Sequence, residues 1–284
     1  MVNFLNAGEA LEWLDNQGNK PDKEINLFEA CLAMALQDHD GISVDSYRQH
    51  LRKLATDLEQ THLDITGSMP SSLEKQIQSY QLCFAQRHGY AGDVARYDNL
   101  ENSDIIRVID RRLGLPITLA ILCIQIGREI GWQVHGLNFP GHFLVRLDFE
   151  GNRAIMDPFQ SCKSLNAADM RDILKKMLGA EAELSSNYYE PASNRDILVR
   201  LHNNIKLRMI EAEHYAQALH SVQVMQKIMP DEYRLDLDAG VLQARLEQPM
   251  AAISSLQSYI DACPNPQDRA EAQGLIAQIQ GQIN

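Results

Sequence analysis

The sequence has few basic residues, few aromatic residues and no overall excess of positive charge. Its 284 residues contain 26 Lys and Arg against 38 Asp and Glu, and the formal net charge is −12. A basic surface, which binding to nucleic acid or to an anionic membrane leaflet requires, is therefore not expected. The charge instead favours a basic or cationic partner.

Long hydrophobic runs are also absent. The longest stretch without Asp, Glu, Lys, Arg or His lies between Arg112 and Arg128 and has 15 residues, whereas a membrane-spanning helix needs ~20. Residues 1–18 lack the basic segment and apolar core of a secretory signal. We therefore expect a cytoplasmic protein.

The sequence also lacks the usual signatures of cofactor sites. Five cysteines are scattered without any CxxC pair, which argues against a disulfide framework and against a zinc site. No phosphate-binding loop and no GxGxxG motif occur, so we expect no nucleotide cofactor. A metal site built from His135, His142 and Asp157 is not expected either, because these side chains fall on different strands and faces.

Helical patterns fill the first 110 residues and continue beyond them. Apolar residues recur at helical spacing in Lys23–Gln37 and again in Ser43–Gln60. Proline suits the first position of a helix, so a helix is predicted over Pro116–Ile130. This segment is apolar on nearly every side, and we expect other elements to enclose it.

Three strand-like runs follow, at Trp132–Phe139, His142–Glu150 and Arg153–Asp157. Pro-Gly and Gly-Asn turns separate them, which predicts an antiparallel meander. In that arrangement His142 and Asp157 lie on adjacent strands. A last helix of this domain is predicted over Ala167–Leu178.

A repeat begins beyond Asn187–Ser193. Ala218 and Pro230 recur 34 residues later as Ala252 and Pro264. The period, with a small residue at the helix-packing position and a proline after the second helix, resembles the tetratricopeptide repeat. We therefore predict two parts: residues 1–187, with a core at about 72–178, and residues 194–284, with two repeats and a capping helix.

Chemistry-bearing residues concentrate in three strings: Arg111 to Ala120 (RRLGLPITLA), Phe139 to Arg146 (FPGHFLVR) and Ile155 to Phe159 (IMDPF). A buried helix, then a strand with His, then a strand with Asp-Pro resembles the order in transglutaminase-like and papain-like enzymes. In the transglutaminase-like pattern G-x-C-x-x-x-A, a cysteine at the helix start is the nucleophile, His is the base and Asp orients the His. The resemblance assigns the base to His142 and the orienting carboxylate to Asp157.

The nucleophile position in this pattern is Pro116. Proline has no thiol and no backbone N–H with which to stabilise an oxyanion, and losing one such donor alone costs about 3–4 kcal/mol of transition-state stabilisation. Thr118, Cys123 and Cys162 are the nearest substitutes, and none is placed obviously for the task.

The strings together resemble a bacterial family, the SirB-type family, often labelled an invasion-gene expression up-regulator. The resemblance runs from about Leu27 to the C-terminus. It implies a mostly helical α+β fold: a transglutaminase-like (papain-like) domain with a small antiparallel sheet, followed by an all-α tetratricopeptide-type segment. A regulatory role in a bacterium follows from this resemblance alone.

Three further residues are candidates for binding a ligand or partner: Arg146, Arg112 and Gly141. Arg146 shares a strand face with His142 and either holds an acidic group or pairs with Asp157 or Asp148. Arg112 either binds an anion or is a solvated helix end.

We predict a non-catalytic, cytoplasmic interaction protein that binds a protein or peptide. The alternative is a hydrolase or amide-transfer enzyme in which His142 and Asp157 act with water or with an unusual nucleophile. A third hypothesis is a small-molecule sensor with its ligand in the remnant cleft.

Overall fold

The computed structural model describes residues 4, 6–39, 41–69 and 71–283. The chain divides into unit 1, with Met1–Ala7 and Asp22–Ile197, and unit 2, with Gly8–Pro21 and Leu198–Asn284. Unit 2 thus includes a segment that lies within the predicted first domain. Lys227 Nζ is 3.1 Å from Asp15 Oδ1, and such a contact between distant residues has no signature in the sequence.

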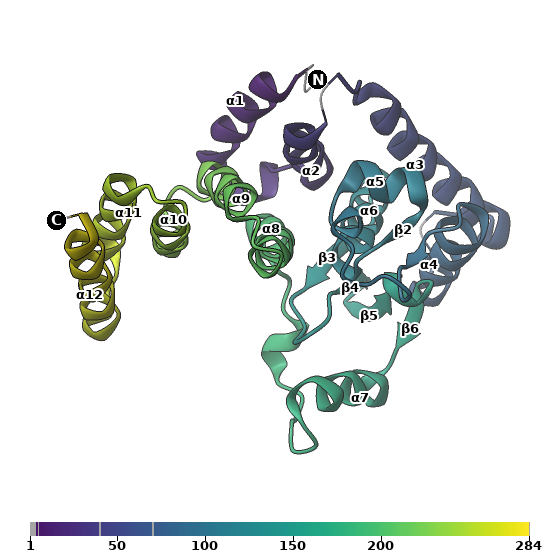
Figure 1. The fold of residues 1–284 in the computed structure, drawn as a ribbon. Helices are drawn as coiled ribbons and strands as arrows, with labels where there is room; N and C mark the ends of the chain where they lie inside the picture. Colours follow the sequence, from purple (N-terminus) through teal and green to yellow (C-terminus); the bar gives the residue numbers. More distant parts are fainter. Residues whose placement is uncertain (1–3, 5, 40, 70, 284) are drawn as a thin grey trace. The chain divides into compact units, whose positions relative to one another are not determined.

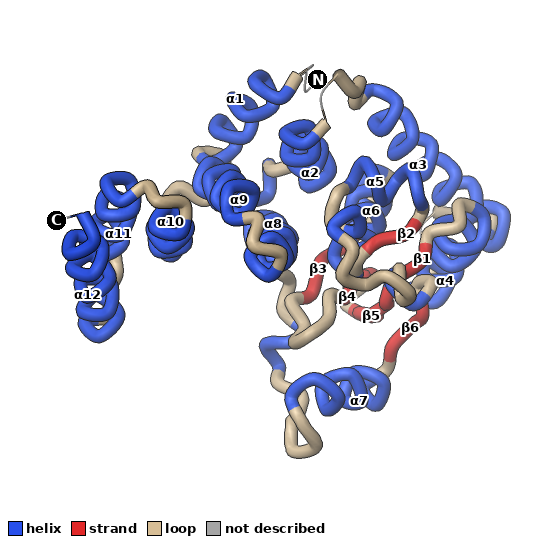
Figure 2. Tube along the Cα trace, in the orientation of Figure 1, coloured by secondary structure: helices blue, strands red, loops and turns tan. Residues whose placement is uncertain are grey.

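Helices make up most of both units (Figure 2). In chain order they are α1 (Ala7–Gly18), α2 (Leu27–Ala35), α3 (Asp45–Thr66), α4 (Leu73–Tyr80), α5 (Ile105–Arg111), α6 (Pro116–Glu129), α7 (Ala167–Leu178), α8 (Asn194–Glu211), α9 (Tyr215–Ile228), α10 (Arg234–Arg245), α11 (Pro249–Ala262) and α12 (Pro266–Ile283). Short helical turns lie at η1 (Asp22–Glu24), η2 (Leu36–Asp38), η4 (Leu100–Asn102), η5 (Pro158–Gln160) and η6 (Ser186–Tyr189), and a π-helical segment, η3, covers Gln81–Arg87.

Helix α6 is the central element of unit 1. It begins at Pro116, whose missing N–H costs nothing at the first helical position, and all its residues from Pro116 to Gly127 are buried. Helices α2, α3 and α5 and strands β3 (Gln133–Leu137) and β4 (Leu144–Phe149) pack around it. The predicted enclosure of this apolar helix is confirmed.

The main sheet has the order β3-β4-β5-β6, with β5 at Asn152–Asp157 and β6 at Lys163–Leu165. All neighbours are antiparallel, which confirms the predicted meander. On one face Leu144 and Ile155 pack against Met170 and Leu174 of α7, while α6 contacts β3 and β4. The strands gather beside α5 and α6 in Figure 1.

A second, smaller sheet pairs β1 (Ala91–Gly92) with β2 (Leu113–Gly114) in parallel. Strands of two or three residues are too short to show a hydrophobic pattern, so neither this pair nor the three-residue β6 could be predicted. The pair nevertheless matters for the site, because β2 leads directly into α6.

The helices of unit 2 include a repeat. The bounds of α9 and α11 differ by 34 residues, the predicted period. Ala218 and Val222 in α9 and the equivalent Ala252 and Leu256 in α11 are fully buried, because small residues let neighbouring helices approach closely. The fold class, a mostly helical α+β domain followed by a tetratricopeptide-like segment, is confirmed.

No helix in the described ranges combines the length and the apolar character that crossing a membrane would require.

Candidate remnant catalytic site

His142 and Asp157 lie together at one end of the β4–β5 pair. His142 Nε2 is 2.9 Å from Asp157 Oδ2. The turn before β4 positions the histidine: the His142 amide donates to the Phe139 carbonyl at 3.2 Å. Gly141, in the third position of that turn, has φ +67°, a conformation that favours glycine.

Asp157 is fully buried, and its carboxylate accepts hydrogen bonds from three groups. Besides His142, it accepts from the Phe159 amide at 3.0 Å and from Gln160 Nε2 at 2.9 Å. Buried carboxylates require such partners, because an unpaired one loses its hydration. Because Nε2 faces Asp157, Nδ1 is the ring nitrogen that would accept a proton in a general-base role.

Pro116 begins α6 and is anchored by the loop that carries Asn102. The Asn102 carbonyl accepts from the Leu115 amide at 3.1 Å and from Thr118 Oγ1 at 2.9 Å. Thr118 Oγ1 also lies 3.0 Å from the Leu115 carbonyl. The Thr118 side chain is fully buried, so its hydroxyl secures the helix start.

The two cysteines named above as substitute nucleophiles are also buried. Cys123 and Cys162 are both 0% exposed. Burial and the neighbouring Cys162 thiol raise the pKa of Cys123 well above its ordinary value. Since the thiolate is the reactive form, this environment suits a structural thiol better than a nucleophile.

The Phe159 ring lies against both Gly92 of β1 and the His142 ring. It lies so close to Gly92 that a Cβ there would be 2.4 Å from ring atoms. The same ring meets His142 edge-on, with centroids 6.0 Å apart, and meets Tyr97 at 5.8 Å. Turn η5, which carries Phe159, packs on both α6 and β1.

A buried ion pair beside the helix start was missed by the sequence analysis. Arg111 Nη2 is 2.7 Å from Asp93 Oδ2, and Arg111 Nη1 is 3.1 Å from Asn102 Oδ1. Burial alone would raise the pKa of Asp93, but hydrogen bonds from the Arg96 amide and from Arg111 lower it overall. Only the Arg-Arg string hinted at this network, and nothing in the sequence pointed to Asp93 as the partner.

Arg146 pairs with an aspartate on its own strand and with a carbonyl outside it. Its guanidinium makes two bonds to Asp148, at 2.7 and 2.6 Å, and donates to the Tyr189 carbonyl at 2.7 Å. The hydrogen bonds from Arg146 lower the pKa of Asp148. Of the partners considered from the sequence, Asp148 is the one that the structure brings to Arg146, and His135 Nε2 also approaches Asp148, at 3.5 Å.

Arg112 ends α5 in a left-handed conformation, with φ 62°. Its guanidinium lies over the Tyr90 ring, with Cζ 4.9 Å from the centroid, and donates to Tyr90 Oη and His50 Nε2. Burial and the Arg112 charge lower the pKa of His50 to about 4. The Arg112 side chain is therefore held by contacts within the chain. At Gly141, a Cβ would lie 2.3 Å from the Met177 side chain, so there is no room for a larger residue without a shift.

Within the ranges that the structure describes, no group of three or more His, Cys, Asp or Glu side chains is arranged to hold a metal ion.

Two family models match the chain. The family model described as transglutaminase-like superfamily matches residues 45–203. The chain belongs to the transglutaminase-like superfamily. A tetratricopeptide repeat model matches residues 205–277. Both results agree with the division into a sheet-containing part and a helical repeat.

The relatives are bacterial. A UPF0162 protein of Xylella fastidiosa (strain Temecula1) is 27% identical over 261 residues, which are 88% of this chain and 89% of the relative. A UPF0162 protein of Vibrio cholerae is 28% identical over 67% of this chain and 70% of its own length. Protein SirB1 of Salmonella typhimurium is 21% identical over 68% of this chain and 72% of its own length. The resemblance to SirB-type proteins is confirmed, and no solved structure matches.

Proposed function

We propose that this protein is a non-catalytic interaction protein built on a degenerate transglutaminase-like domain, with the repeat segment binding a protein or peptide partner. The observation that carries the proposal is that Pro116 begins α6, where the transglutaminase-like pattern has its nucleophile, while His142 and Asp157 keep the hydrogen-bonded pair of that pattern. The pair would then serve to hold β4 and β5 together at their end.

The surroundings of the other possible nucleophiles support the proposal. The Thr118 hydroxyl is bonded to two backbone carbonyls. Cys123 is buried and its pKa is raised, which disfavours the thiolate. A histidine–aspartate pair without a nucleophile or a metal must activate water unaided, and the acceleration from general-base catalysis alone is about 10²–10⁴-fold.

The position of Phe159 is consistent with the same conclusion. An acyl-transfer site needs room for a carbonyl group near both the base and the helix start. Here the Phe159 ring lies against His142 and occupies the space above Gly92.

The repeat segment supplies the interaction function in this proposal. Arrays of helical repeats present extended concave surfaces that bind peptides or helices of other proteins. The formal charge of −12 favours a basic partner over nucleic acid or an anionic membrane. A cytoplasmic, regulatory or assembly role is part of the proposal.

Turnover measurements test the proposal. The purified protein and its His142→Ala variant are assayed with p-nitrophenyl esters and with glutamine-containing peptide amides, at pH 6 to 9. We expect both to give the rate of buffer with an inert protein. The matched control is His135→Ala, which also removes a histidine close to a carboxylate in the same sheet.

A rate that is lost in His142→Ala and kept in His135→Ala would overturn the proposal. It would favour the second candidate function, a hydrolase in which the hydrogen-bonded pair activates water. The 2.9 Å distance between His142 and Asp157 is the observation on which that alternative rests.

A further inference from the structure

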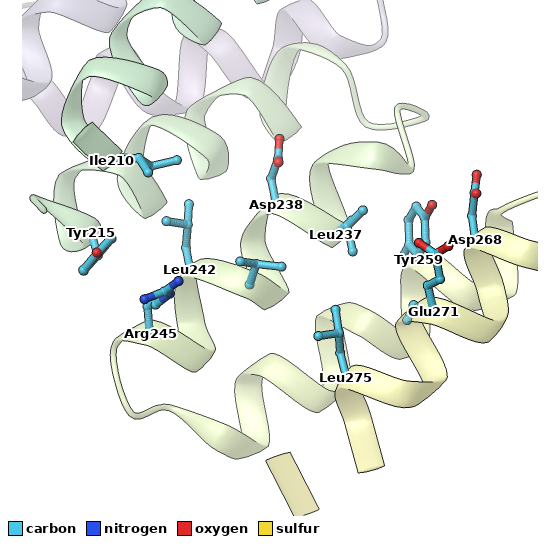
Figure 3. Close-up of a pocket in the computed structure, with 12 residues that line it drawn as sticks. Ile210, Tyr215, Leu237, Asp238, Leu242, Arg245, Tyr259, Asp268, Glu271 and Leu275 are labelled. Atoms are coloured by element: carbon cyan, nitrogen blue, oxygen red, sulfur yellow. The ribbon is translucent and has the colours of Figure 1, made fainter. Parts of the chain in front are cut away.

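Unit 2 contains a groove whose floor is apolar. It has a volume of about 560 Å³ and is lined mainly by α10 and α12, with contributions from the end of α8 and from α9 and α11. Leu237, Leu242 and Leu275 lie between its two ends (Figure 3). Val241 and Leu275 are 41% and 37% exposed, so apolar surface in the groove remains in contact with water.

One end of the groove is acidic. Asp268 and Glu271, one turn apart on α12, lie at this end (Figure 3). Neither carboxylate forms an ion pair with any residue in the described parts of the chain, and Glu271 only accepts from the Gln267 amide at 3.5 Å. Asp238, in the middle of the groove, differs because Lys206 pairs with it.

The opposite end of the groove is basic. Arg245 and Tyr215 lie there (Figure 3), and the Arg245 guanidinium carbon is 5.8 Å from the centre of the Tyr215 ring. The groove therefore has an apolar middle, two carboxylates at one end and one guanidinium at the other.

We propose that this groove binds one amphipathic helix of a partner protein in a fixed direction, with its N-terminal, lysine- or arginine-bearing turn at Asp268 and Glu271. The C-terminal, acidic turn of the helix then lies at Arg245. This inference rests on the proposed function, because it names the partner chemistry of the same repeat segment.

The physical argument for the direction combines side-chain charge with the helix dipole. Apolar side chains at helical spacing fill an apolar groove. The N-terminus of a helix carries partial positive charge and its C-terminus partial negative charge. Both effects place the N-terminal end of the partner helix near the two carboxylates and its C-terminal end near Arg245, and complementary charges fix the register of a complex.

The test uses the full-length protein and two fluorescein-labelled peptides of about 18 residues, long enough to form a helix of some 27 Å. Both carry leucines at positions i, i+3, i+4 and i+7. The forward peptide has lysines in its first turn and glutamates in its last, and the reversed peptide exchanges them. Binding is measured by fluorescence anisotropy at low and high salt.

We expect the forward peptide to bind about tenfold tighter than the reversed one, since each exposed charge pair contributes a few tenths to one kcal/mol. The double variant Asp268→Asn with Glu271→Gln should weaken the forward peptide about five- to tenfold and abolish the preference. The control Asp261→Asn with Glu247→Gln removes the same charge from exposed positions outside the groove and should change nothing. Val241→Asn should weaken both peptides.

Three outcomes would overturn the inference. Equal binding of both peptides, or equal effects of the groove and control variants, would show that the groove does not bind a helix in a fixed direction. Light scattering that shows a dimer dissociated by the groove variant would make the occupant a second copy of this chain. Competition by lysine or spermidine alone, with no peptide preference, would make it a small cation. Each of these leaves the non-catalytic part of the proposed function intact, which only His142-dependent turnover overturns.

Discussion

The Nε2 atom of His142 lies 2.9 Å from Oδ2 of an Asp157 that is completely buried. Asp157 also receives hydrogen bonds from the Phe159 amide and from Gln160, so one carboxylate ties the turn before β4 to the turn after β5. In the transglutaminase-like pattern such a pair would be a base and its orienting carboxylate, and the helix that Pro116 begins would carry the nucleophile at this position.

If the pair is structural, its loss should appear in stability. His142→Ala removes one of three donors to a buried carboxylate and should lower the free energy of unfolding by about 1–3 kcal/mol. His142→Gln, which keeps a donor, should lose less. Urea denaturation followed by circular dichroism measures both. A His142→Ala variant as stable as the parent would contradict a structural role for the pair.

The close approach of Phe159 to Gly92 predicts a specific coupling. Gly92→Ala places a Cβ 2.4 Å from the ring and should destabilise the protein by about 1–3 kcal/mol. Adding Phe159→Ala should relieve part of this cost, giving a coupling energy of about 1 kcal/mol in a double-mutant cycle.

The control for this cycle is Gly274→Ala in α12, where a Cβ would meet no atom within 4 Å. It should be neutral or stabilising, because alanine is the better helix former. Additive effects of Gly92→Ala and Phe159→Ala would show that the ring does not occupy this space.

The Thr118 hydroxyl should secure the start of α6. Thr118→Val keeps the shape of the side chain and deletes the bonds to the Asn102 and Leu115 carbonyls, so we expect a loss of about 0.5–1.5 kcal/mol. Thr118→Ser, which keeps the hydroxyl, should retain most of the stability. Thermal unfolding distinguishes the two, and equal melting temperatures would contradict this assignment.

His202 predicts a dependence of stability on pH. Its Nδ1 lies 2.9 Å from Ser221 Oγ, and burial, with a smaller effect of His220, lowers its pKa from 6.5 to about 4. Between these two values the unfolded chain binds a proton that the folded one excludes. The stabilising contribution is therefore complete above pH 6.5 and decreases as the pH falls toward 4.

By pH 5 this contribution should have fallen by about 2 kcal/mol. Denaturation at pH 7.5 and pH 5 measures the change, and His202→Gln should show a correspondingly flatter dependence. An identical pH dependence in parent and variant would show that His202 titrates normally.

Local rules accounted for much of the fold. Helix α7 was predicted with its observed bounds, Ala167–Leu178, and α6 within one residue at its end. The start of α6 is fixed by Pro116. Its end is fixed by Gly131, which lies just beyond the helix and has φ +82°. The repeat was visible because each repeat must bury equivalent small and apolar residues.

The rest depended on contacts between distant segments. The site pair could be predicted, since the antiparallel meander brings the turn before β4, with His142, to the end of β5, with Asp157. The position of Phe159 on Gly92, the Asp93–Arg111 pair and the packing of residues 8–21 in unit 2 could not. Each joins segments without a common pattern, and only the folded chain brings them together.

The most direct test of the central claim is the rate of ester and amide cleavage by the parent protein compared with His142→Ala, measured under the same conditions with His135→Ala as control. We predict that all three proteins give the background rate. Turnover that the parent and His135→Ala share and His142→Ala lacks would contradict it, and would make His142 and Asp157 a working catalytic pair.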